Sequence, residues 1–194
     1  MPDIDIDFAN RDKALAVFKH ITASRWVDNT LKPHNTGVYL HSVPTHAPTN
    51  LCSAPYKEAE DNGWFKLDFL NVGIYNDIIN EDHLHKLMEK EPLWDLLTHK
   101  EFSDKLFHVA GHNTVLEKMK PKSIEQLAAV LAMIRPAKRY LIGKEWTTVM
   151  KEVWTKPEND DYYFKKSHAT AYAVGVVVHM NLICEKISAQ SAGS

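Results

Sequence analysis

The stretch PDIDIDF, residues 2–8, opens the chain with a strict alternation of acidic and apolar residues. A period of two predicts a β-strand with Asp3, Asp5 and Asp7 on one face and the apolar side chains on the other. Carboxylates two residues apart on an extended strand lie roughly 6–7 Å apart and repel one another unless water or a cation intervenes. The alternation therefore indicates a divalent-cation site or an exposed acidic face, with Asp3 in an outer or solvated position.

A second stretch, WFKLDFL at residues 64–70, alternates in the same way. It predicts another strand, with apolar residues on one face and Lys66 and Asp68 on the other. If this strand pairs beside the first one, Asp5, Asp7 and Asp68 converge on one surface. Such an oxygen-rich surface is the environment that Mg²⁺ or Mn²⁺ prefers.

The segments around these strands indicate how the first part of the chain is organised. Leu15, Phe18 and Ile21 have helical spacing, which predicts a short helix directly after the first strand. Residues 41–56 contain three prolines among polar residues, which predicts an irregular connection between the two strands. The 194 residues, 44% of them hydrophobic, suit one globular domain or two small lobes on a shared core.

The second part of the chain has a helical pattern from Glu81 onward. Ser123 and Gln126 form a capping-box signature before an apolar helix, and Pro136 ends that helix just after Arg135. We therefore predict an α+β protein with a small β-sheet region over residues 1–80 and a mostly helical region over residues 81–194, or one compact domain that combines them.

A last helix is expected after Ser167, which is predicted to be its N-cap. The helix is apolar nearly all round through Val178, so it should be buried. Its N-terminus, with Lys165, Lys166 and His168 beside Ser167, is a candidate anion site.

Five motifs resemble, in the same order, those of the C-family DNA polymerases, the bacterial DNA polymerase III alpha subunits. Residues 2–8 resemble the palm motif that carries the family's aspartates. Residues 34–39, HNTGVY, resemble His-Ala-Ala-Gly-Val-Val, and residues 65–70, FKLDFL, resemble Lys-Phe-Asp-Phe-Leu. Residues 123–136 resemble the segment that ends in Arg-Pro-Gly. Residues 164–173, FKKSHATAYA, resemble the fingers run Lys-Ser-His-Ala-Ala-Ala-Tyr-Ala.

The resemblance implies a palm-like sheet of the polymerase-beta-like nucleotidyltransferase kind, with a helical fingers-like half. It implies that Asp5 and Asp7 hold the metal ion that carries a triphosphate, and that Asp68 helps to hold the ion that activates a primer 3′-hydroxyl. Two-metal catalysis needs such carboxylates, because they clamp ions on the attacking and leaving oxygens. Lys66 matches a basic palm residue and would neutralise the triphosphate. The implied cofactor is Mg²⁺ or Mn²⁺.

The resemblance also implies a set of residues that bind a deoxynucleoside triphosphate and primer-template DNA. Two basic spots contribute to it, although solvated helix ends and loops explain these charges equally well. The candidate nucleotide- and DNA-binding residues are Arg135, Lys138, Arg139, Lys165, Lys166, Ser167, His168 and His34.

The departures from the family pattern are large. Family members are several times longer, and because the acidic motif sits at residue 3, we expect the phosphoesterase-like domain and the palm strand with a Gly-Ser motif to be missing. Too little chain lies between Asp7 and Asp68 for a thumb, and Ala137 replaces the glycine of Arg-Pro-Gly. A clamp-binding motif and an oligonucleotide-binding fold are also expected to be missing. We therefore expect no processive synthesis by this chain alone.

Charge and cysteine content restrict the function classes further. A net charge of −2 and a sequence pI near 6.6 argue against a strong general DNA binder, so nucleic-acid contacts should be local. Cys52 and Cys184 lie far apart and predict no disulfide or metal framework. No signal peptide is visible, and the apolar run 169–178 is too short to span a bilayer. We expect a cytoplasmic protein without membrane contact, in a host cytoplasm if the gene belongs to a phage.

Three function classes stay open from the sequence. The first is a miniature metal-dependent nucleotidyltransferase, completed by a partner such as a replication protein or a second copy. The second is a catalytically inactive module, derived from a polymerase, that binds DNA, nucleotide or a replication protein. The third is a metal nuclease that uses the same carboxylates.

Overall fold

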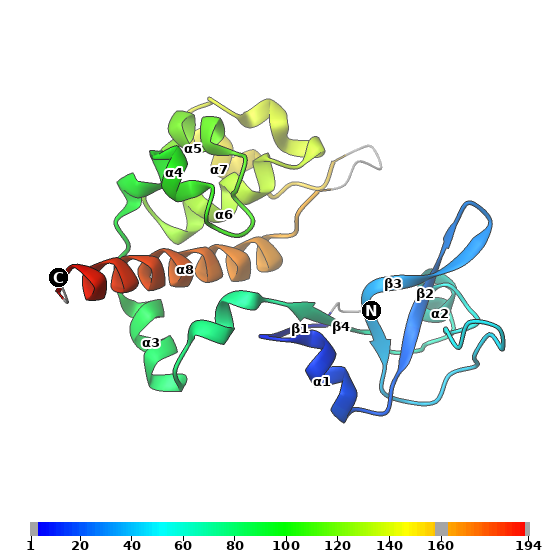
Figure 1. Cartoon of the computed structure of the whole chain (residues 1–194). Helices are drawn as coiled ribbons and strands as arrows, with labels where there is room; N and C mark the ends of the chain where they lie inside the picture. The colour runs from blue at the N-terminus through cyan, green and yellow to red at the C-terminus, as the bar shows by residue number, and fades with distance from the viewer. Residues whose placement is uncertain (1–3, 158–162, 193–194) are drawn as a thin grey trace. The chain divides into compact units, whose positions relative to one another are not determined.

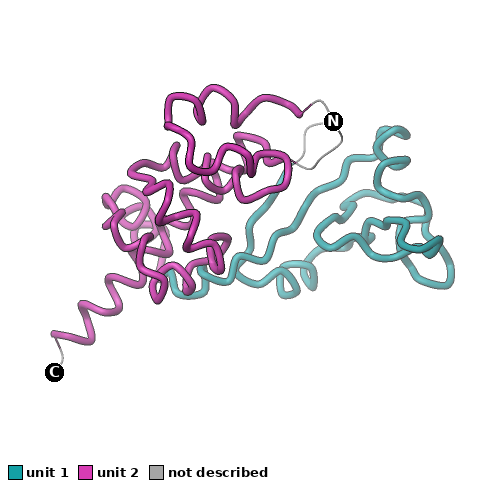
Figure 2. Tube along the Cα trace, turned by 90° about the horizontal axis from the view of Figure 1, so that it is seen from above, with its two compact units in different colours: residues 1–78 teal, residues 79–194 magenta. Residues whose placement is uncertain are grey.

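The computed structural model describes residues 4–157 and 163–192, so Asp3 lies outside the described part (Figure 1). The protein is α+β, as predicted, with a four-stranded mixed sheet followed by helices. The chain forms two compact units, Met1–Ile78 and Ile79–Ser194 (Figure 2).

Unit 1 contains the sheet, in which β1 runs parallel to β4 while β4–β3 and β3–β2 are antiparallel. The strand order is β1-β4-β3-β2. The elements of unit 1 are β1 (Ile4–Phe8), α1 (Arg11–Val17), β2 (Ile21–Val27), β3 (Thr30–Tyr39), α2 (Tyr56–Asp61), β4 (Leu67–Asn71) and the 3₁₀ helix η1 (Gly73–Asp77).

The two alternating stretches form adjacent strands, which confirms the predicted pairing, although β4 begins at Leu67 and residues 64–66 precede it. Asp5 lies directly opposite Asp68 in the parallel register. The opposite face of the pair is apolar, because the Phe69 ring packs 4.6 Å from that of Phe8 and 6.0 Å from that of Phe18, centroid to centroid. Phe69 is buried, so this face belongs to the interior of unit 1. The carboxylates are therefore directed to the other side of the sheet.

Two local predictions around the first strand have different outcomes. The short helix after β1 is confirmed as α1, and the Asn10 side chain caps it by accepting a hydrogen bond from the backbone N–H of Lys13. The inclusion of Ile21 in the helical pattern is wrong, because Ile21 begins β2. The connection predicted over residues 41–56 is irregular through residue 55, apart from two isolated bridges, Thr45 with Cys52 and Pro55 with Ser24, and Tyr56 begins α2.

The β2–β3 hairpin is a feature that the sequence analysis did not predict. Asp28 and Asn29 connect the strands with φ angles of 49° and 57°. Two consecutive positive φ angles are the requirement of a two-residue type I′ turn, and Asp and Asn tolerate them better than most residues. The Asp-Asn pair between two strand-forming runs was the signal for this hairpin.

Unit 2 is helical throughout its described part, as predicted from the pattern after Glu81. Its elements are α3 (Glu81–Glu89), η2 (Trp94–Thr98), α4 (Lys100–Ser103), α5 (Asn113–Met119), α6 (Ile124–Met133), η3 (Pro136–Leu141), α7 (Trp146–Glu152) and α8 (Lys166–Ala192).

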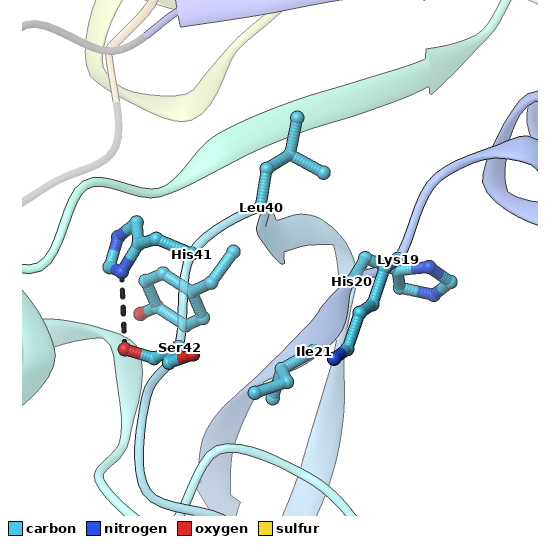
Figure 3. Close-up of a pocket in the computed structure, with 7 residues that line it drawn as sticks. Lys19, His20, Ile21, Leu40, His41 and Ser42 are labelled. Carbon is cyan, nitrogen blue, oxygen red and sulfur yellow. Dashed lines mark hydrogen bonds between the residues drawn. The ribbon is translucent and has the colours of Figure 1, made fainter.

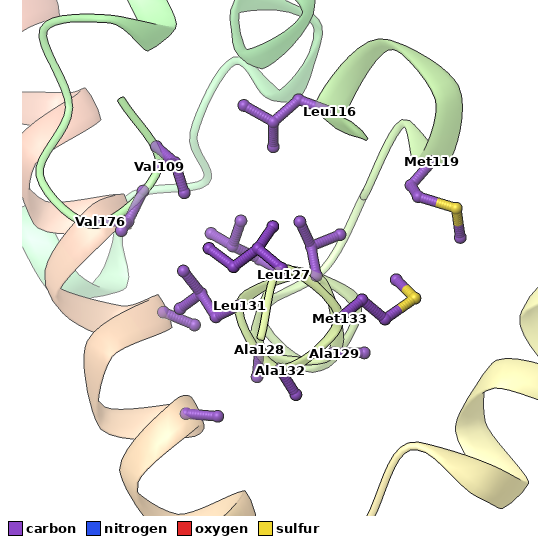
Figure 4. Close-up of a cluster of buried hydrophobic side chains, with 14 of the residues drawn as sticks. Val109, Leu116, Met119, Leu127, Ala128, Ala129, Leu131, Ala132, Met133 and Val176 are labelled. Carbon is purple, nitrogen blue, oxygen red and sulfur yellow. The ribbon is translucent and has the colours of Figure 1, made fainter. Parts of the chain in front are cut away.

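Helix α6 forms the centre of the unit 2 core. Ser123 caps it as predicted, accepting a hydrogen bond from the backbone N–H of Gln126 at 3.2 Å. All residues from Leu127 to Met133 are buried, since neighbouring elements cover the helix on every side (Figure 4). Helix α8 packs along α6 and contributes Val176 to the same cluster. Because α6 is buried along this length, the position of its C-terminal end within unit 2 is fixed, and Arg135 follows directly after that end.

Helix α8 begins at Lys166, so the prediction that Ser167 is its N-cap is wrong by two positions, and Lys165 occupies that place. Its buried Asn181 side chain donates hydrogen bonds to the carbonyls of Leu87 and Lys90 at 2.9 and 2.8 Å, which joins α8 to the end of α3. By length and composition α8 is apolar enough to cross a bilayer, but half of that window is buried inside the structure. This burial against α6 is typical of a core helix.

Candidate functional site

An irregularity between β2 and β3 shapes the candidate site in unit 1. Regular pairing stops with Ser24 opposite Pro33 and resumes with Thr22 opposite Val38. One residue of β2 therefore faces four residues of β3, 34–37, which bulge out of the ladder. Bulges bend a strand and redirect its side chains, and they are frequent beside active sites. Here the bulge directs the Thr36 side chain to Asp68 of β4, while Asn35 faces Arg25 of β2.

His34 closes this bulge through its ring. Its Nδ1 accepts the backbone N–H of Gly37 at 2.9 Å and that of Thr36 at 3.3 Å. The ring proton is therefore on Nε2, and the imidazole is neutral. Burial and the nearby Lys66 ammonium lower the pKa of His34, in agreement with this tautomer. Although Nδ1 lies 3.7 Å from Asp68 Oδ1, the two do not form an ion pair, because Nδ1 carries no proton.

Asp68 is held from two sides. The Lys66 ammonium donates to Oδ2, and the Thr36 hydroxyl donates to Oδ1 at 2.7 Å. The side chains of Lys66 and Asp68 are only 16% and 13% exposed, so their ion pair is largely shielded from water. Gly37 lies opposite Asp68 and leaves room for them, because a Cβ there would be 2.7 Å from Lys66 Cδ and 2.9 Å from His34 Nδ1.

Asp5 and Asp7 project from β1 on the same face as Asp68. Asp5 is its register partner, and neighbouring strands are about 4.8 Å apart, so the two carboxylates are close neighbours. Asp7 Oδ2 accepts a hydrogen bond from the Tyr75 hydroxyl at 3.3 Å. Burial raises the pKa of Asp7; the Tyr75 hydrogen bond opposes this shift, and the charge of Asp5 adds to it.

The fit of a divalent cation to these residues is partial. Carboxylate oxygens are the ligands that Mg²⁺ and Mn²⁺ prefer, so the donor chemistry is suitable. However, Lys66 and Thr36 occupy both oxygens of Asp68. Within residues 4–157 and 163–192, no group of three or more His, Cys, Asp or Glu residues is arranged to hold a metal ion. The arrangement seen here therefore does not form a two-metal site, and metal binding by Asp5, Asp7 and Asp68 stays a prediction.

A small cavity of about 190 Å³ lies at the open end of the β2–β3 pair, away from the hairpin turn, and is lined by Lys19, His20 and His41 among others (Figure 3). His41 Nε2 accepts the backbone N–H of Phe65 at 3.2 Å, so its Nδ1–H donates to the Ser42 carbonyl at 3.4 Å. Both ring nitrogens are thus used to hold the chain before β4. We assign His41 a structural role.

In unit 2, Arg135 follows α6 and places its guanidinium 5.3 Å from the centroid of the Phe164 ring. Its Nε is buried and has no hydrogen-bond partner, and no carboxylate in the described part of the chain forms an ion pair with it. Burial lowers the pKa of His108 and His112, and the Arg135 charge lowers it further. Among the described residues, Arg135 is thus a cation without a carboxylate partner, beside two histidines of lowered pKa, and such a group is suited to an anion.

The other predicted residues around Arg135 differ in their surroundings. Lys138 is only 2% exposed, and its ammonium donates to the Glu152 carbonyl at 2.8 Å and to the Thr155 hydroxyl at 3.0 Å. Lys138 therefore caps the end of α7, and its burial opposes the predicted contact with nucleotide or DNA. Arg139 Nε donates to the Ile134 carbonyl at 3.3 Å, which leaves the rest of the guanidinium at the surface.

The start of α8 lies next to Arg135 through a shared aromatic ring. Phe164 contacts the Arg135 guanidinium on one side, and its centroid is 6.4 Å from that of His168. Lys165, Lys166 and Ser167 are exposed at this end of the helix. The structure therefore brings Arg135 together with the 165–168 run, while His34, Lys66 and the three aspartates form a separate group in unit 1.

Thr36 and Tyr75 are site residues that the sequence analysis did not identify. Thr36 lies inside the motif 34–39, but only the bulge directs its hydroxyl to Asp68. Tyr75 lies after β4 in η1, and no spacing relates it to Asp7. Their contributions depend on contacts between residues 32 and 68 positions apart.

No protein-family model matches the chain, and comparisons with curated proteins and with solved structures find no significant match. The polymerase resemblance therefore rests on the five sequence motifs alone.

Gly37→Ala tests the packing of the site. The added methyl group would displace the Lys66 stem or the His34 ring, and we expect a loss of about 1–3 kcal/mol in unfolding free energy, as for other overpacked sites. Gly73→Ala is the matched control, since a Cβ there meets nothing within 4 Å. Chemical denaturation of both variants measures the difference, and equal stability of the two would contradict this packing.

The tautomer of His34 predicts a pH dependence. Because the pKa of His34 is below its ordinary value of 6.5, the unfolded chain takes up this proton first as pH falls. The contribution of the neutral His34 ring to the free energy of unfolding should be complete above pH 6.5. It should decrease as the pH falls toward the pKa of His34 in the folded protein. Long-range ¹H–¹⁵N NMR should show a proton on Nε2 alone at pH 7. A proton on Nδ1, or protonation above pH 6.5, would contradict the assignment.

Proposed function

We propose that this chain is a DNA polymerase III alpha-like protein with a nucleotidyltransferase-type site. It binds a deoxynucleoside triphosphate and primer-template DNA with Mg²⁺ or Mn²⁺. The observation that carries the proposal is the parallel register of β1 and β4, which sets Asp5 beside Asp68 on one face. The same sheet positions Lys66 and His34 around Asp68, so four residues of three separate motifs share one location.

The residues of unit 1 suit the handling of phosphate and cation. When bound, the metal ions would stabilise charge on the attacking and leaving oxygens of nucleotidyl transfer. Asp5, Asp7 and Asp68 supply the negative charge for them, and Lys66 supplies a cation for the triphosphate. Tyr75 orients Asp7 through its hydroxyl, and the neutral His34 maintains the bulge that faces Asp68.

In the proposed function, unit 2 supplies a surface that binds an anion. Arg135 is a cation without a carboxylate partner among the described residues, and it lies over the Phe164 ring near the start of α8. A nucleotide phosphate is the anion that we assign to Arg135, together with the exposed Lys165, Lys166 and Ser167. Lys138 is not included, because its ammonium is used inside unit 2.

The overall charge supports a dependence on a partner. A net charge of −2 supplies little general attraction for DNA, whose binding needs a basic surface. A replication protein or a second copy of this chain would therefore provide the remaining grip on primer-template DNA. We propose that the protein works in the cytoplasm, of a host cell if the gene is a phage gene.

A catalytically inactive binding module is the second candidate function. The observation that favours it is the state of Asp68, whose two oxygens are held by Lys66 and Thr36. A carboxylate in this state stabilises the sheet and does not require a cation. In that case the chain binds DNA, nucleotide or a replication protein through Arg135 and the start of α8.

The two functions differ in metal binding. Asp5→Asn and Asp68→Asn should each weaken Mn²⁺ binding by about tenfold or more, because each removes one carboxylate charge from the cation. Calorimetric titration with Mn²⁺, with and without dATP, measures this effect. Asp12→Asn is the control, since the Asp12 side chain is 95% exposed in the same unit. Native affinity in both site variants, or no binding by the native chain, favours the inactive module.

Nucleotide binding tests the role of Arg135. Arg135→Gln should weaken dATP binding by about tenfold or more, the equivalent of one charge-assisted hydrogen bond, and leave Mn²⁺ binding without nucleotide unchanged. Lys144→Gln is the matched control, because the Lys144 ammonium also lies over an aromatic ring, 4.8 Å from the centroid of Tyr140. Equal losses in the two variants would indicate a general charge effect and contradict a specific phosphate contact.

A further inference from the structure

The two oxygens of Asp68 have partners of different kinds. Oδ1 accepts the hydroxyl of Thr36, a short β-branched side chain with restricted χ1 freedom. Oδ2 accepts the ammonium of Lys66, which lies at the end of a flexible four-carbon stem. The first partner is therefore fixed by its backbone, and the second can move away without any change in the sheet.

We propose that Thr36 is a positioning residue for Asp68. Its hydroxyl holds Oδ1, so that Oδ2 stays directed to the place now taken by the Lys66 ammonium, where a divalent cation replaces it. The inference rests on the proposed function, because it assumes that Asp68 binds a cation. In this inference, Lys66 holds Asp68 while no cation is bound, and Thr36 sets the orientation of Asp68 as a cation ligand.

The backbone of Thr36 is held by the bulge that it belongs to. Its own N–H and that of Gly37 both donate to His34 Nδ1, at 3.3 and 2.9 Å. The 2.7 Å distance from Thr36 Oγ1 to Asp68 Oδ1 is short, as expected for a hydroxyl that donates to a charged oxygen. His34, Thr36 and Asp68 therefore form a connected series of hydrogen bonds that does not include Lys66.

The exchange of Lys66 for a cation is consistent with the space around it. Gly37 leaves the Lys66 stem unobstructed at its Cδ, where any larger residue would press on it. A divalent ion carries twice the charge of the ammonium and competes for the same carboxylate oxygen. Release of the ammonium also frees a positive charge for a nucleotide phosphate. The Lys66 ammonium thus balances the charge of Asp68 before the cation binds, and it is available to the phosphate afterwards.

The hydroxyl of Thr36 is a feature of this chain that its motif does not supply. In the family segment His-Ala-Ala-Gly-Val-Val, the position that matches Thr36 is an alanine, which has no hydrogen-bond donor in its side chain. The contact between Thr36 and Asp68 is therefore an addition to the resemblance.

A direct test removes Lys66 and asks what still holds Asp68. In a Lys66→Met background, three-bond NMR couplings to the Asp68 β-protons should report one rotamer, because the Thr36 hydroxyl remains. Adding Thr36→Val should give averaged couplings, and adding Thr36→Ser should restore one rotamer. Thr30→Val is the matched control, since Thr30 lies exposed in the same strand and its hydroxyl donates to the Asp28 carbonyl, away from Asp68. A single rotamer in the Lys66→Met, Thr36→Val variant overturns the proposal.

A second measurement uses the chain with Lys66 intact and does not depend on the folding of the double variant. Thr36→Val should weaken Mn²⁺ binding by roughly 10- to 100-fold, the range for partners that orient a metal ligand, while Thr36→Ser should stay near the native affinity. Native affinity in Thr36→Val overturns the proposal. If the native chain binds no Mn²⁺, the proposed function fails together with the exchange of Lys66, and the rotamer comparison still decides whether Thr36 positions Asp68.

Discussion

The parallel pairing of β1 with β4 places two carboxylates, Asp5 and Asp68, side by side, and the rest of unit 1 depends on how this charge is balanced. Adjacent strands hold such groups about 4.8 Å apart, a distance at which like charges repel unless a partner compensates them. Lys66 compensates Asp68 from the residue directly before β4, and Thr36 does so from the bulge of β3. The bulge exists because His34 accepts two backbone N–H groups, and it closes on β4 because Gly37 has no side chain.

Unit 2 shows how burial distinguishes cations that look alike in sequence. Arg135 and Lys138 are three residues apart, and both belong to one basic spot. The Lys138 ammonium satisfies the end of α7 inside the unit, so its charge serves stability. Arg135 stacks on Phe164 and keeps an unpaired Nε, so its charge has no protein partner among the described residues. Arg135 and Lys138 differ in their surroundings because the chain turns into η3 directly after α6. The position of this turn depends on the packing around α6.

Local patterns were informative where a period or a cap decides the structure. The alternation in residues 2–8 and 64–70 predicted both site strands and their faces, and the Ser123 cap predicted the start of α6. The pattern failed at Ile21, which has helical spacing but belongs to a strand, since three apolar residues are too few to define a period. The β2–β3 hairpin was missed because its Asp28 and Asn29 turn is two residues long, a weak signal without the strands around it.

The sequence by itself determined the α+β class, the acidic face of the first strand and the candidate residues Asp5, Asp7 and Asp68, since these follow from spacing along the chain, while Lys66 became a candidate through the resemblance. Only the tertiary structure decided that Thr36 and Tyr75 join them, that Lys138 is buried, and that Lys66 and Asp68 pair with each other. The physical reason is that alternation assigns a side chain to a face, whereas hydrogen bonds and burial depend on which segments meet. Those meetings arise from the bulge in β3 and the packing of α6, and neither is encoded in any single stretch of the chain.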